Sequence, residues 1–456
     1  MRSDDPPSST DQTQGADDRS NPAAKPPAAR DDRTSNNLGR DASGSKTGRG
    51  AARISWRRNL YALWIAQLLA IMGFSLRTPF LPFFLGDLGV DTVEGQALWS
   101  GIVNAGGAGV MAISAPIWGT VADRYGRKPM LMRAQFSAFF TIGLMAFATE
   151  AWHLLGLRLI EGALAGTVTA ATALVAVSMP KDRLGFGLGM IQTAVFSGSA
   201  LGPLVGGVLA DVIGPRPSFI VSAFMLLASG LITLYFVQER FTPVSRDPNA
   251  PKQVSMWKVV AAPALLGLIT VMFAVRFSSA AVQPITPLFV GELSGDMGNA
   301  ATQAGLAMGV LGLTSAISSV YLGRLGDKRG HRTILLACMV GSGLIYLPMA
   351  VSQHPWQLIV LEAVFGIFAG GTIPAANAMI ATLTDPARRG AIYGVVAAAS
   401  SVGGFLGPLI GAGLAAGVGF RVTFLLTGVV LLVVTAMLIV TERRAGTRGE
   451  ETSAPA

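Results

Sequence analysis

The chain has 456 residues, of which 51% are hydrophobic and only 13% are charged, whereas about 25% of an ordinary soluble domain is charged. This composition excludes an ordinary water-soluble globular protein and predicts a protein embedded in a lipid bilayer. The net charge of +9 would also suit a nucleic-acid-binding protein. However, the basic residues are spread over alternate loops and form no single patch, so we expect no nucleic-acid partner.

The predicted elements follow one another in two similar blocks. Residues 1–55 are rich in Asp, Arg, Pro, Ser and Gly, which predicts a disordered cytoplasmic tail. Beyond it lie apolar runs of about 20 residues, the length at which a helix crosses a bilayer. We expect six spans in residues 56–238, a cytoplasmic linker at 239–257, six spans in 258–441 and a cytoplasmic tail at 442–456. The predicted fold is an all-α membrane protein with twelve transmembrane helices in two six-helix repeats.

The charges of the predicted loops alternate along the chain. Every second loop is basic, with Arg57, Arg124, Arg127, Lys128, Arg133, Lys181, Arg240, Lys328 and Arg443 among its members. The loops between them are mainly acidic and include Asp87, Asp91, Glu150, Asp211 and Glu292. Because Lys and Arg gather in the cytoplasmic loops of membrane proteins, this pattern predicts a multi-pass protein of the inner (plasma) membrane with both termini in the cytoplasm.

The two blocks are copies of one unit. A shift of about 204 residues aligns "GTVADRYGRK" (119–128) with "GRLGDKRGHR" (323–332), and a similar shift aligns "GSALGPLVGG" (198–207) with "GGFLGPLIGA" (403–412). Since each copy has an even number of spans, both copies have the same orientation and pack around an axis normal to the membrane. We therefore expect the substrate to bind between the two halves.

The loop pattern G-x-x-x-D-R-x-G-R-K resembles the signature of the major facilitator superfamily, and the likeness covers residues 56–441. "LRLIEGALAG" (157–166) resembles the motif of that family's fourth helix. The resemblance implies a cytoplasmic gate that latches the two halves in the outward-facing state; the alternative is a loop that only sets orientation. The gate residues that it implies are Gly119, Asp123, Arg127, Gly323 and Asp327.

Within this gate, Asp123 is expected either to lie against the positive end of a neighbouring helix or to pair with Arg127. In the second copy His331 replaces the arginine that matches Arg127. We expect the second latch to be weaker or sensitive to pH.

The fifth span contains a glycine pattern that resembles the drug:proton antiporter branch of the family. Its members are Gly189, Gly198, Gly202, Pro203, Gly206 and Gly207. Glycines four residues apart share a helix face and let another helix approach closely. The resemblance implies that this helix packs at the contact between the halves and seals it, whereas the alternative is ordinary small-residue packing.

Five ionisable residues lie inside the predicted spans, where each costs about 2.5–3.5 kcal/mol on insertion scales and is usually functional. They are Arg77, Arg158, Glu161, Arg276 and Glu362. They fall on the first and fourth spans of each half, which line the central cavity in the family. We expect Arg77 and Arg276 to line the substrate cavity, and Arg158, Glu161 and Glu362 to couple protons. An ion pair of Arg158 with Glu362 across the cavity is predicted, and the alternative role of these charges is a permanent buried salt bridge.

The sequence favours transport over catalysis. Its three histidines form no metal-ligand pair and no Walker loop is present, so we expect no enzyme activity, cofactor or metal. The leading hypothesis is an exporter of small amphipathic or anionic compounds that exchanges them for protons. Its partners would be a small-molecule substrate, protons and the lipid bilayer, and we expect a monomer. The alternatives are a symporter or facilitator that imports a small organic anion, and a membrane receptor or lipid-handling protein that transports little.

The alternating loop charges generate a topology prediction. A reporter protein fused after Arg444 is expected to give a cytoplasmic signal, because both the charge pattern and an even number of spans place the C-terminus there. A periplasmic signal from this fusion would contradict the predicted topology.

Overall fold

The computed structural model describes residues 56–180, 183–239, 241, 263–295, 297–384 and 389–451. The predicted N-terminal tail at 1–55, nearly all of the predicted linker at 239–257 and the last five residues lie outside this part of the chain. Helix α16 continues to Glu451, so its backbone extends beyond residue 441, at which the last span was expected to end.

The described chain folds into helices, in two sets that we call the first and the second half. The first half consists of α1 (Trp56–Leu76), α2 (Leu81–Asp87), α3 (Val93–Tyr125), α4 (Arg127–Met145), α5 (Ala151–Ala163), α6 (Thr167–Ser178), α7 (Leu184–Ile213) and α8 (Pro215–Phe236). The second half consists of α10 (Pro263–Val282), α11 (Thr286–Ser294), the short 3-10 helix η2 (Met297–Asn299), α12 (Ala300–Arg329), α13 (His331–Ala350), α14 (Pro355–Leu383), α15 (Arg389–Val418) and α16 (Phe420–Glu451).

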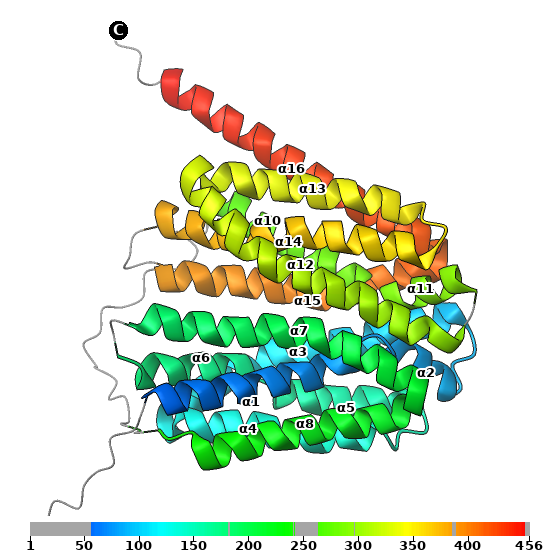
Figure 1. Cartoon of the computed structure of the whole chain (residues 1–456). Helices are drawn as coiled ribbons and strands as arrows, with labels where there is room; N and C mark the ends of the chain where they lie inside the picture. Colours follow the sequence, from blue (N-terminus) through cyan, green and yellow to red (C-terminus); the bar gives the residue numbers. More distant parts are fainter. Residues whose placement is uncertain are drawn as a thin grey trace, which may run out of the picture. The chain divides into compact units, whose positions relative to one another are not determined.

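Eleven helices of the described residues are long and apolar enough to cross a membrane, when α5 is taken with α6 and α10 with α11. Helix α4 is not among them because its first two turns carry Arg127, Lys128 and Arg133, but it packs along α8 inside the first half. The predicted all-α membrane fold is confirmed. The helices run side by side from one end of the bundle to the other (Figure 1).

The two ends of the bundle differ in charge. We call the end at which α1 begins, with Arg57 and Lys328, the basic end, and the opposite end, with Asp87 and Glu150, the acidic end. The sharp turns from α3 to α4 and from α12 to α13 lie at the basic end. They are made by Gly126 and Gly330, whose φ angles of 98° and 90° suit glycine. These positions are 204 residues apart, so the repeat seen in the sequence is also a repeat of backbone geometry.

Two spans are broken at prolines. The first span of each half stops before its acidic end and restarts as a short helix, α2 or α11, with Pro82 or Pro287 in the first turn. Proline lacks the N–H group that a continuous helix requires, but it is suited to a first turn. Residues 77–80 and 283–285 form turns between the two helices of each span, inside the bundle.

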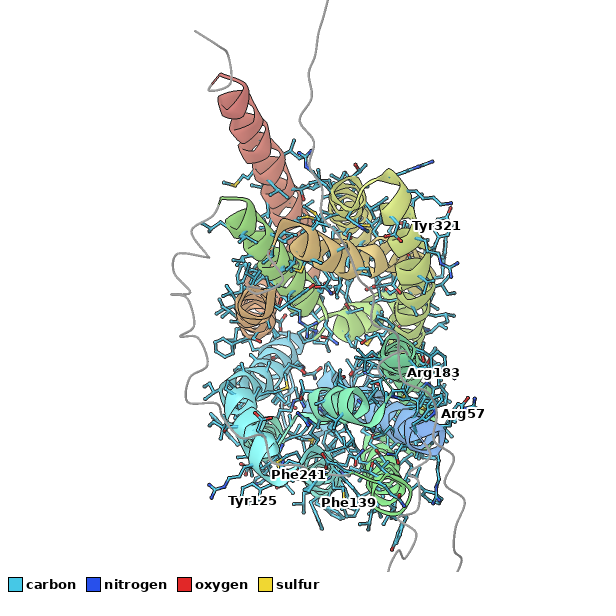
Figure 2. The ribbon with its side chains drawn as sticks, turned by 90° about the vertical axis from the view of Figure 1, so that its left-hand side faces the viewer. Arg57, Tyr125, Phe139, Arg183, Phe241 and Tyr321 are labelled. Carbon is cyan, nitrogen blue, oxygen red and sulfur yellow. The ribbon has the colours of Figure 1, made fainter. Side chains whose placement is uncertain are left out.

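The halves contact each other through α3 with α15 and α7 with α12. Figure 2 views the bundle along its helices, with the first half (blue to green) below the second (green to red). Gly101 of α3 lies so close to Pro408 and Ala412 of α15 that a Cβ atom would overlap them, and Gly305 of α12 has the same relation to Pro203 of α7. These equivalent contacts lie toward the acidic end, so the halves are held together there.

One contact between the halves has no equivalent in the repeat. The Oδ2 atom of Asp211 in α7 accepts a hydrogen bond of 2.7 Å from the backbone N–H of Thr302, in the first turn of α12. This N–H group has no partner within its own helix, and Asn299 provides no side-chain cap. Helix α3, the counterpart of α12, is instead capped by its own Thr92. The carboxylate of Asp211 therefore fastens the second half to the first at the acidic end.

Replacing Asp211 by alanine is expected to weaken the closed acidic end by about 1 kcal/mol, the usual effect of losing a helix cap. Spin labels attached at Asp91→Cys in the first half and Glu292→Cys in the second would measure the opening of this end. We expect a larger population of long distances between the two labels in Asp211→Ala. The matched control is Glu150→Ala, since Glu150 precedes a helix of the same end without capping it. An unchanged distance distribution in Asp211→Ala would contradict this role.

Candidate functional site

Three of the predicted site residues meet inside the first half. Arg77 lies in the break between α1 and α2, and Arg158 and Glu161 lie three residues apart on one face of α5. Nη2 of Arg77 and Nη1 of Arg158 both donate to Oε1 of Glu161, at 2.9 and 2.6 Å. Arg77 and Glu161 are only 5% and 4% exposed, so this is a buried cluster with one net positive charge.

The cluster has unused hydrogen-bonding groups. Oε2 of Glu161, Nη1 of Arg77 and Nε of Arg158 are buried and have no hydrogen-bond partner among the described residues. Two guanidinium groups on one carboxylate oxygen favour the ionised form of Glu161. The remaining N–H donors, together with the excess positive charge, suit an additional anionic group such as a carboxylate.

A second helix break lies next to this cluster, between α5 and α6. Nε1 of Trp118 donates to the carbonyl of Ala163 at 2.6 Å, and Nη2 of Arg133 donates to the carbonyls of Leu164 and Ala165 at 3.3 and 3.1 Å. The guanidinium of Arg133 lies 3.3 Å from the centre of the Trp118 ring, in a cation–π contact. The freed carbonyls are thus satisfied by side chains, which permits a discontinuous helix at this depth.

Sequence reasoning missed the roles of Trp118 and Arg133. Arg133 was taken as a residue of a basic loop, but it lies in the second turn of α4, inside the bundle. The only signal in the sequence was that Arg133 lies five residues after Lys128, which places it inside the predicted helix and not in the loop. Neither residue has an equivalent in the second copy, where Leu322 and Ala337 stand at the matching positions.

The charged residues of the second half remain apart from the cluster. Glu362 lies in α14 and is 5% exposed, whereas the side chain of Arg276 in α10 is exposed. The predicted ion pair of Arg158 with Glu362 is wrong for this structure, because Arg158 pairs with Glu161 on its own helix. No ion pair of the described residues includes Glu362.

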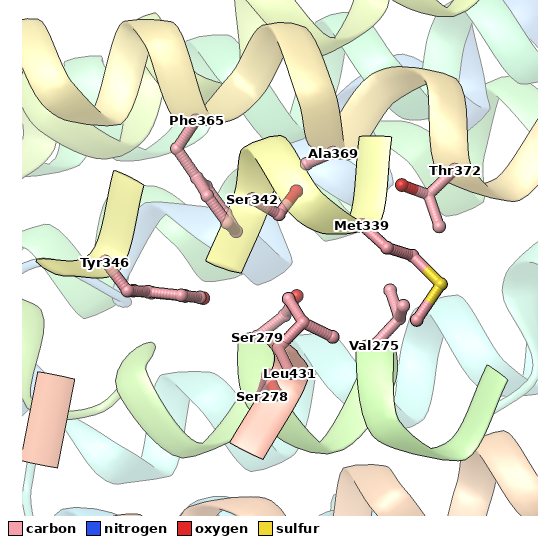
Figure 3. Close-up of a pocket in the computed structure, with 10 residues that line it drawn as sticks. All are labelled: Val275, Ser278, Ser279, Met339, Ser342, Tyr346, Phe365, Ala369, Thr372 and Leu431. Carbon is pink, nitrogen blue, oxygen red and sulfur yellow. The ribbon is translucent and has the colours of Figure 1, made fainter. Parts of the chain in front are cut away.

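A pocket lies inside the second half, between α10, α13, α14 and α16 (Figure 3). It is small, with room for about one water molecule. Its lining combines apolar side chains with hydroxyl groups from Ser278, Ser279, Ser342, Tyr346 and Thr372. On α14 the pocket is lined by Phe365, Ala369 and Thr372, which share a helix face with Glu362.

The predicted gate residues do not bridge the halves in this structure. Asp123 pairs with Arg127 at 3.9 Å while its side chain is 64% exposed, and Asp327 pairs with His331 at 3.3 Å. The positive end of the neighbouring helix α4 is instead occupied by Glu239, which accepts hydrogen bonds from the backbone N–H groups of Arg127 and Lys128 at 2.9 and 2.8 Å. The sequence placed Glu239 in the linker.

Gly119 has no described atom within 4 Å of the position that a Cβ would occupy. Gly323 has only Pro374 of its own half at the limit of that range. Among the described residues, neither gate glycine therefore makes a close contact between the halves in the conformation seen.

The antiporter-type glycines lie mainly on another face than expected. Gly198, Gly202 and Gly206 face α1 of the same half, and we call them the glycine stripe. A Cβ atom on Gly198 would lie 3.0 Å from the carbonyl oxygen of Leu68. A Cβ atom on Gly202 would lie 2.8 Å from the carbonyl oxygen of Met72. Only Pro203 and Gly207 face α12 of the other half. Gly189 has open space beside it among the described residues. The glycine stripe was predicted to seal the contact between the two halves. This prediction is wrong for the structure seen, because the stripe packs against α1 of its own half.

The fold and site define a multi-pass membrane transporter with broken spans and charged groups at membrane depth. The family model "Major Facilitator Superfamily" matches residues 63–296 and 268–455, and the chain belongs to this family. The chain is 36% identical over 379 residues to the multidrug resistance protein MdtG of Escherichia fergusonii, covering 83% of this chain and 93% of the relative. It is 34% identical over 380 residues to the multi-drug resistance efflux pump PmrA homolog of Lactococcus lactis, covering 83% and 94%.

Solved structures of transporters share the fold. A bacterial homologue of the human lysosomal transporter Spinster, in an inward-facing and unoccupied conformation, has a TM-score of 0.71 at 16% identity, covering 86% of this chain and 98% of that chain. The human organic anion transporter MFSD10 has a TM-score of 0.62 at 19% identity, covering 84% and 99%. The predicted family is confirmed, and it is a family of transporters and not of enzymes.

The different surroundings of the two carboxyl groups generate a stability prediction. Glu161→Gln is expected to lower the free energy of unfolding by about 3–5 kcal/mol, because it leaves the buried Arg77 and the partly buried Arg158 uncompensated. The same change at Glu362 removes no ion pair and is expected to cost about 1 kcal/mol or less. Unfolding of the purified variants in detergent measures both. Equal losses, or no rescue of Glu161→Gln by a second change Arg77→Gln, would contradict the cluster's role in stability.

Proposed function

We propose that the chain is a secondary-active exporter of the inner membrane, which moves small amphipathic or anionic compounds out of the cell in exchange for protons. The observation that carries this proposal is the buried cluster of Arg77, Arg158 and Glu161 beside two helix breaks. Buried charge of this kind is expensive in a membrane and marks substrate or ion pathways. The names of the relatives, a multidrug resistance protein and an efflux pump, support export as the direction.

In the proposed mechanism, the two halves (56–238 and 258–441) rock against each other about the contacts of α3 with α15 and α7 with α12. The structure corresponds to the state closed at the acidic end, which is the outer side in the proposed topology. The gate residues Asp123 and Asp327 would engage the opposite half when the basic end closes. The glycine stripe on α7 keeps α1 and α7 together, so that the break at Arg77 moves with α7 as one body. A single chain contains both halves, so a monomer is the proposed functional unit.

The arginines supply the site for substrate. An anionic group that enters the cluster competes with Glu161 for the guanidinium N–H groups of Arg77 and Arg158. The positive charge favours this group, while apolar surroundings accept the rest of an amphipathic compound. Arg276, exposed in the other half, is a second cation that attracts the same class of compound. Protons enter the cycle at the carboxyl groups of Glu161 and Glu362, with Arg158 setting the charge beside Glu161.

The proposed function predicts transport in everted membrane vesicles with an acidic interior. The anionic dye fluorescein is expected to accumulate in the vesicles, and a protonophore is expected to abolish accumulation. Arg158→Gln is expected to reduce the rate about tenfold or more, because losing one charged contact to a bound group costs about 2–5 kcal/mol. Arg57→Gln, which alters an exposed basic residue in the first turn of α1, is the matched control.

Two results would contradict this proposal. Uptake of fluorescein into right-side-out vesicles driven by an inward proton gradient would indicate a symporter that imports anions. Absence of flux for fluorescein and for the cationic dye ethidium alike, from a well-expressed protein, would indicate that transport is not the main activity.

A further inference from the structure

Arg276 of α10 is a cation at membrane depth whose side chain has no protein partner. The side chain is exposed, and it makes no hydrogen bond, ion pair or ring contact with any described residue. A charge at this depth is expensive and usually pairs with another group or faces a water-filled cavity. Since Arg276 is both exposed and unpaired among the described residues, its guanidinium group is available to a bound molecule.

The face of α10 that carries Arg276 is turned away from α16. Gly267 and Arg276 are nine residues apart, which is two and a half turns, so they lie on opposite faces of α10. Gly267 packs against α16, where a Cβ atom would lie 2.8 Å from Cδ1 of Leu438. Arg276 lies against α15 instead, because a Cβ atom on Gly404 would lie 3.5 Å from Nε of Arg276.

Helix α15 connects the site of Arg276 to the first half. One face of α15, with Pro408 and Ala412, contacts α3, and another face, with Gly407 and Gly411, contacts α10. At 3.6 residues per turn, Gly404 falls between these two faces. The side chain of Arg276 therefore lies where α10, α15 and α3 meet.

Arg158 of the first half lies against α3 at a similar depth. A Cβ atom on Gly107 of α3 would lie 2.8 Å from Nε of Arg158. Gly107 follows the first residue of α3 by fourteen residues, and Gly404 precedes the last residue of α15 by the same number. Both of these helix ends lie at the acidic end, so the two arginines flank the contact of α3 with α15 at one level. Packed helix axes are about 8–10 Å apart, so one small molecule can reach both guanidinium groups.

The two arginine sites together carry two positive charges. The cluster of Arg77, Arg158 and Glu161 has one net positive charge and buried N–H donors without a partner among the described residues. Arg276 contributes the other. Glu362 of α14 is buried without an ion pair, and such burial favours its neutral form. A ligand with two anionic groups therefore compensates the charge of both halves, whereas a monoanion leaves one site unpaired.

We propose that the transported compounds carry two anionic groups, of which one binds the cluster at Arg158 and the other binds Arg276. This inference rests on the proposed function, because it specifies the class of anion that the exporter accepts. Arg276 then determines specificity: the first half binds an anionic group, and the second half selects compounds that have a second one. Such a ligand contacts both halves at once, as expected of a substrate about which the halves rock.

The test is the binding of straight-chain carboxylates to the purified full-length protein in detergent, measured by isothermal titration calorimetry. Butanedioate, hexanedioate, octanedioate and decanedioate are compared with the monocarboxylates of the same chain lengths. At the chain length that reaches both arginines, the second carboxylate is expected to tighten binding about tenfold or more, since close charge pairs across an interface couple strongly. The second carboxylate makes the compound less apolar, so burial of apolar surface does not explain such a gain.

Three variants assign the gain to Arg276. Arg276→Gln is expected to remove the advantage of dicarboxylates while the affinity for monocarboxylates stays unchanged, and Arg276→Lys is expected to retain part of the advantage. Arg158→Gln is expected to weaken the binding of both classes. The matched control is Arg57→Gln, which alters an exposed arginine in the first turn of α1 and is expected to keep the full advantage.

Three results would overturn the two-arginine site. They are equal affinities of mono- and dicarboxylates at every chain length, an advantage that survives Arg276→Gln, and an advantage of the same size at every length, which indicates attraction to the overall positive charge without bridging. Equal affinities in a protein that exports fluorescein against protons would overturn this site alone. Selective binding of one dicarboxylate by a protein that transports neither fluorescein nor ethidium would support the site and count against the exporter function.

Discussion

A charge inside a bilayer must be paired or neutralised, and the arrangement of this protein depends on that constraint. The two halves satisfy it differently. In the first half Glu161 is held between Arg77 and Arg158, which leaves one positive charge in excess. In the second half Glu362 is buried without an ion-pair partner among the described residues, and such burial favours the neutral form of a carboxyl group. Arg158 and Glu362 occupy equivalent positions of the repeat, so the two copies have diverged to an arginine in one half and a carboxyl group in the other. In the proposed function, the first half binds the anion and the second half carries the proton.

The repeat also determines how the halves meet. Equivalent glycines, Gly101 and Gly305, let α3 and α12 approach α15 and α7 with almost no space between the backbones. Such packing can rock as a hinge because no large side chain interlocks at the contact. Asp211 breaks the symmetry by capping α12 from the opposite half, which favours closure at the acidic end. Opening of the acidic end must break this hydrogen bond and separate the glycine contacts near it.

Much of this architecture is predictable from the sequence. Long apolar runs identify nearly all of the spans, the shift of 204 residues identifies the two copies, and the rarity of charge inside the spans identifies the five ionisable residues. These signals depend on position along a helix, which a sequence specifies directly.

The remaining features depend on which way each helix face points, and a single sequence does not specify this. The pairing of Arg158 with Glu161 instead of Glu362 is decided by the rotation of α5. The glycine stripe of α7 was expected at the contact between halves, yet a rotation of α7 turns it toward α1 while Gly207 faces α12. Arg133 was assigned to a basic loop and Glu239 to the linker. In the structure Glu239 caps α4, and Arg133 donates to the carbonyl groups at the break after α5.

The central claim is that movement of substrate in one direction drives protons in the other. Purified protein in liposomes tests it most directly, with fluorescein and a pH-sensitive dye enclosed and no initial pH gradient. In this account, fluorescein that leaves through the protein acidifies the interior, and the acidification disappears in Glu362→Gln while exchange of fluorescein against fluorescein continues. An interior that becomes alkaline as fluorescein leaves, or one whose pH stays constant during rapid efflux, would contradict the account.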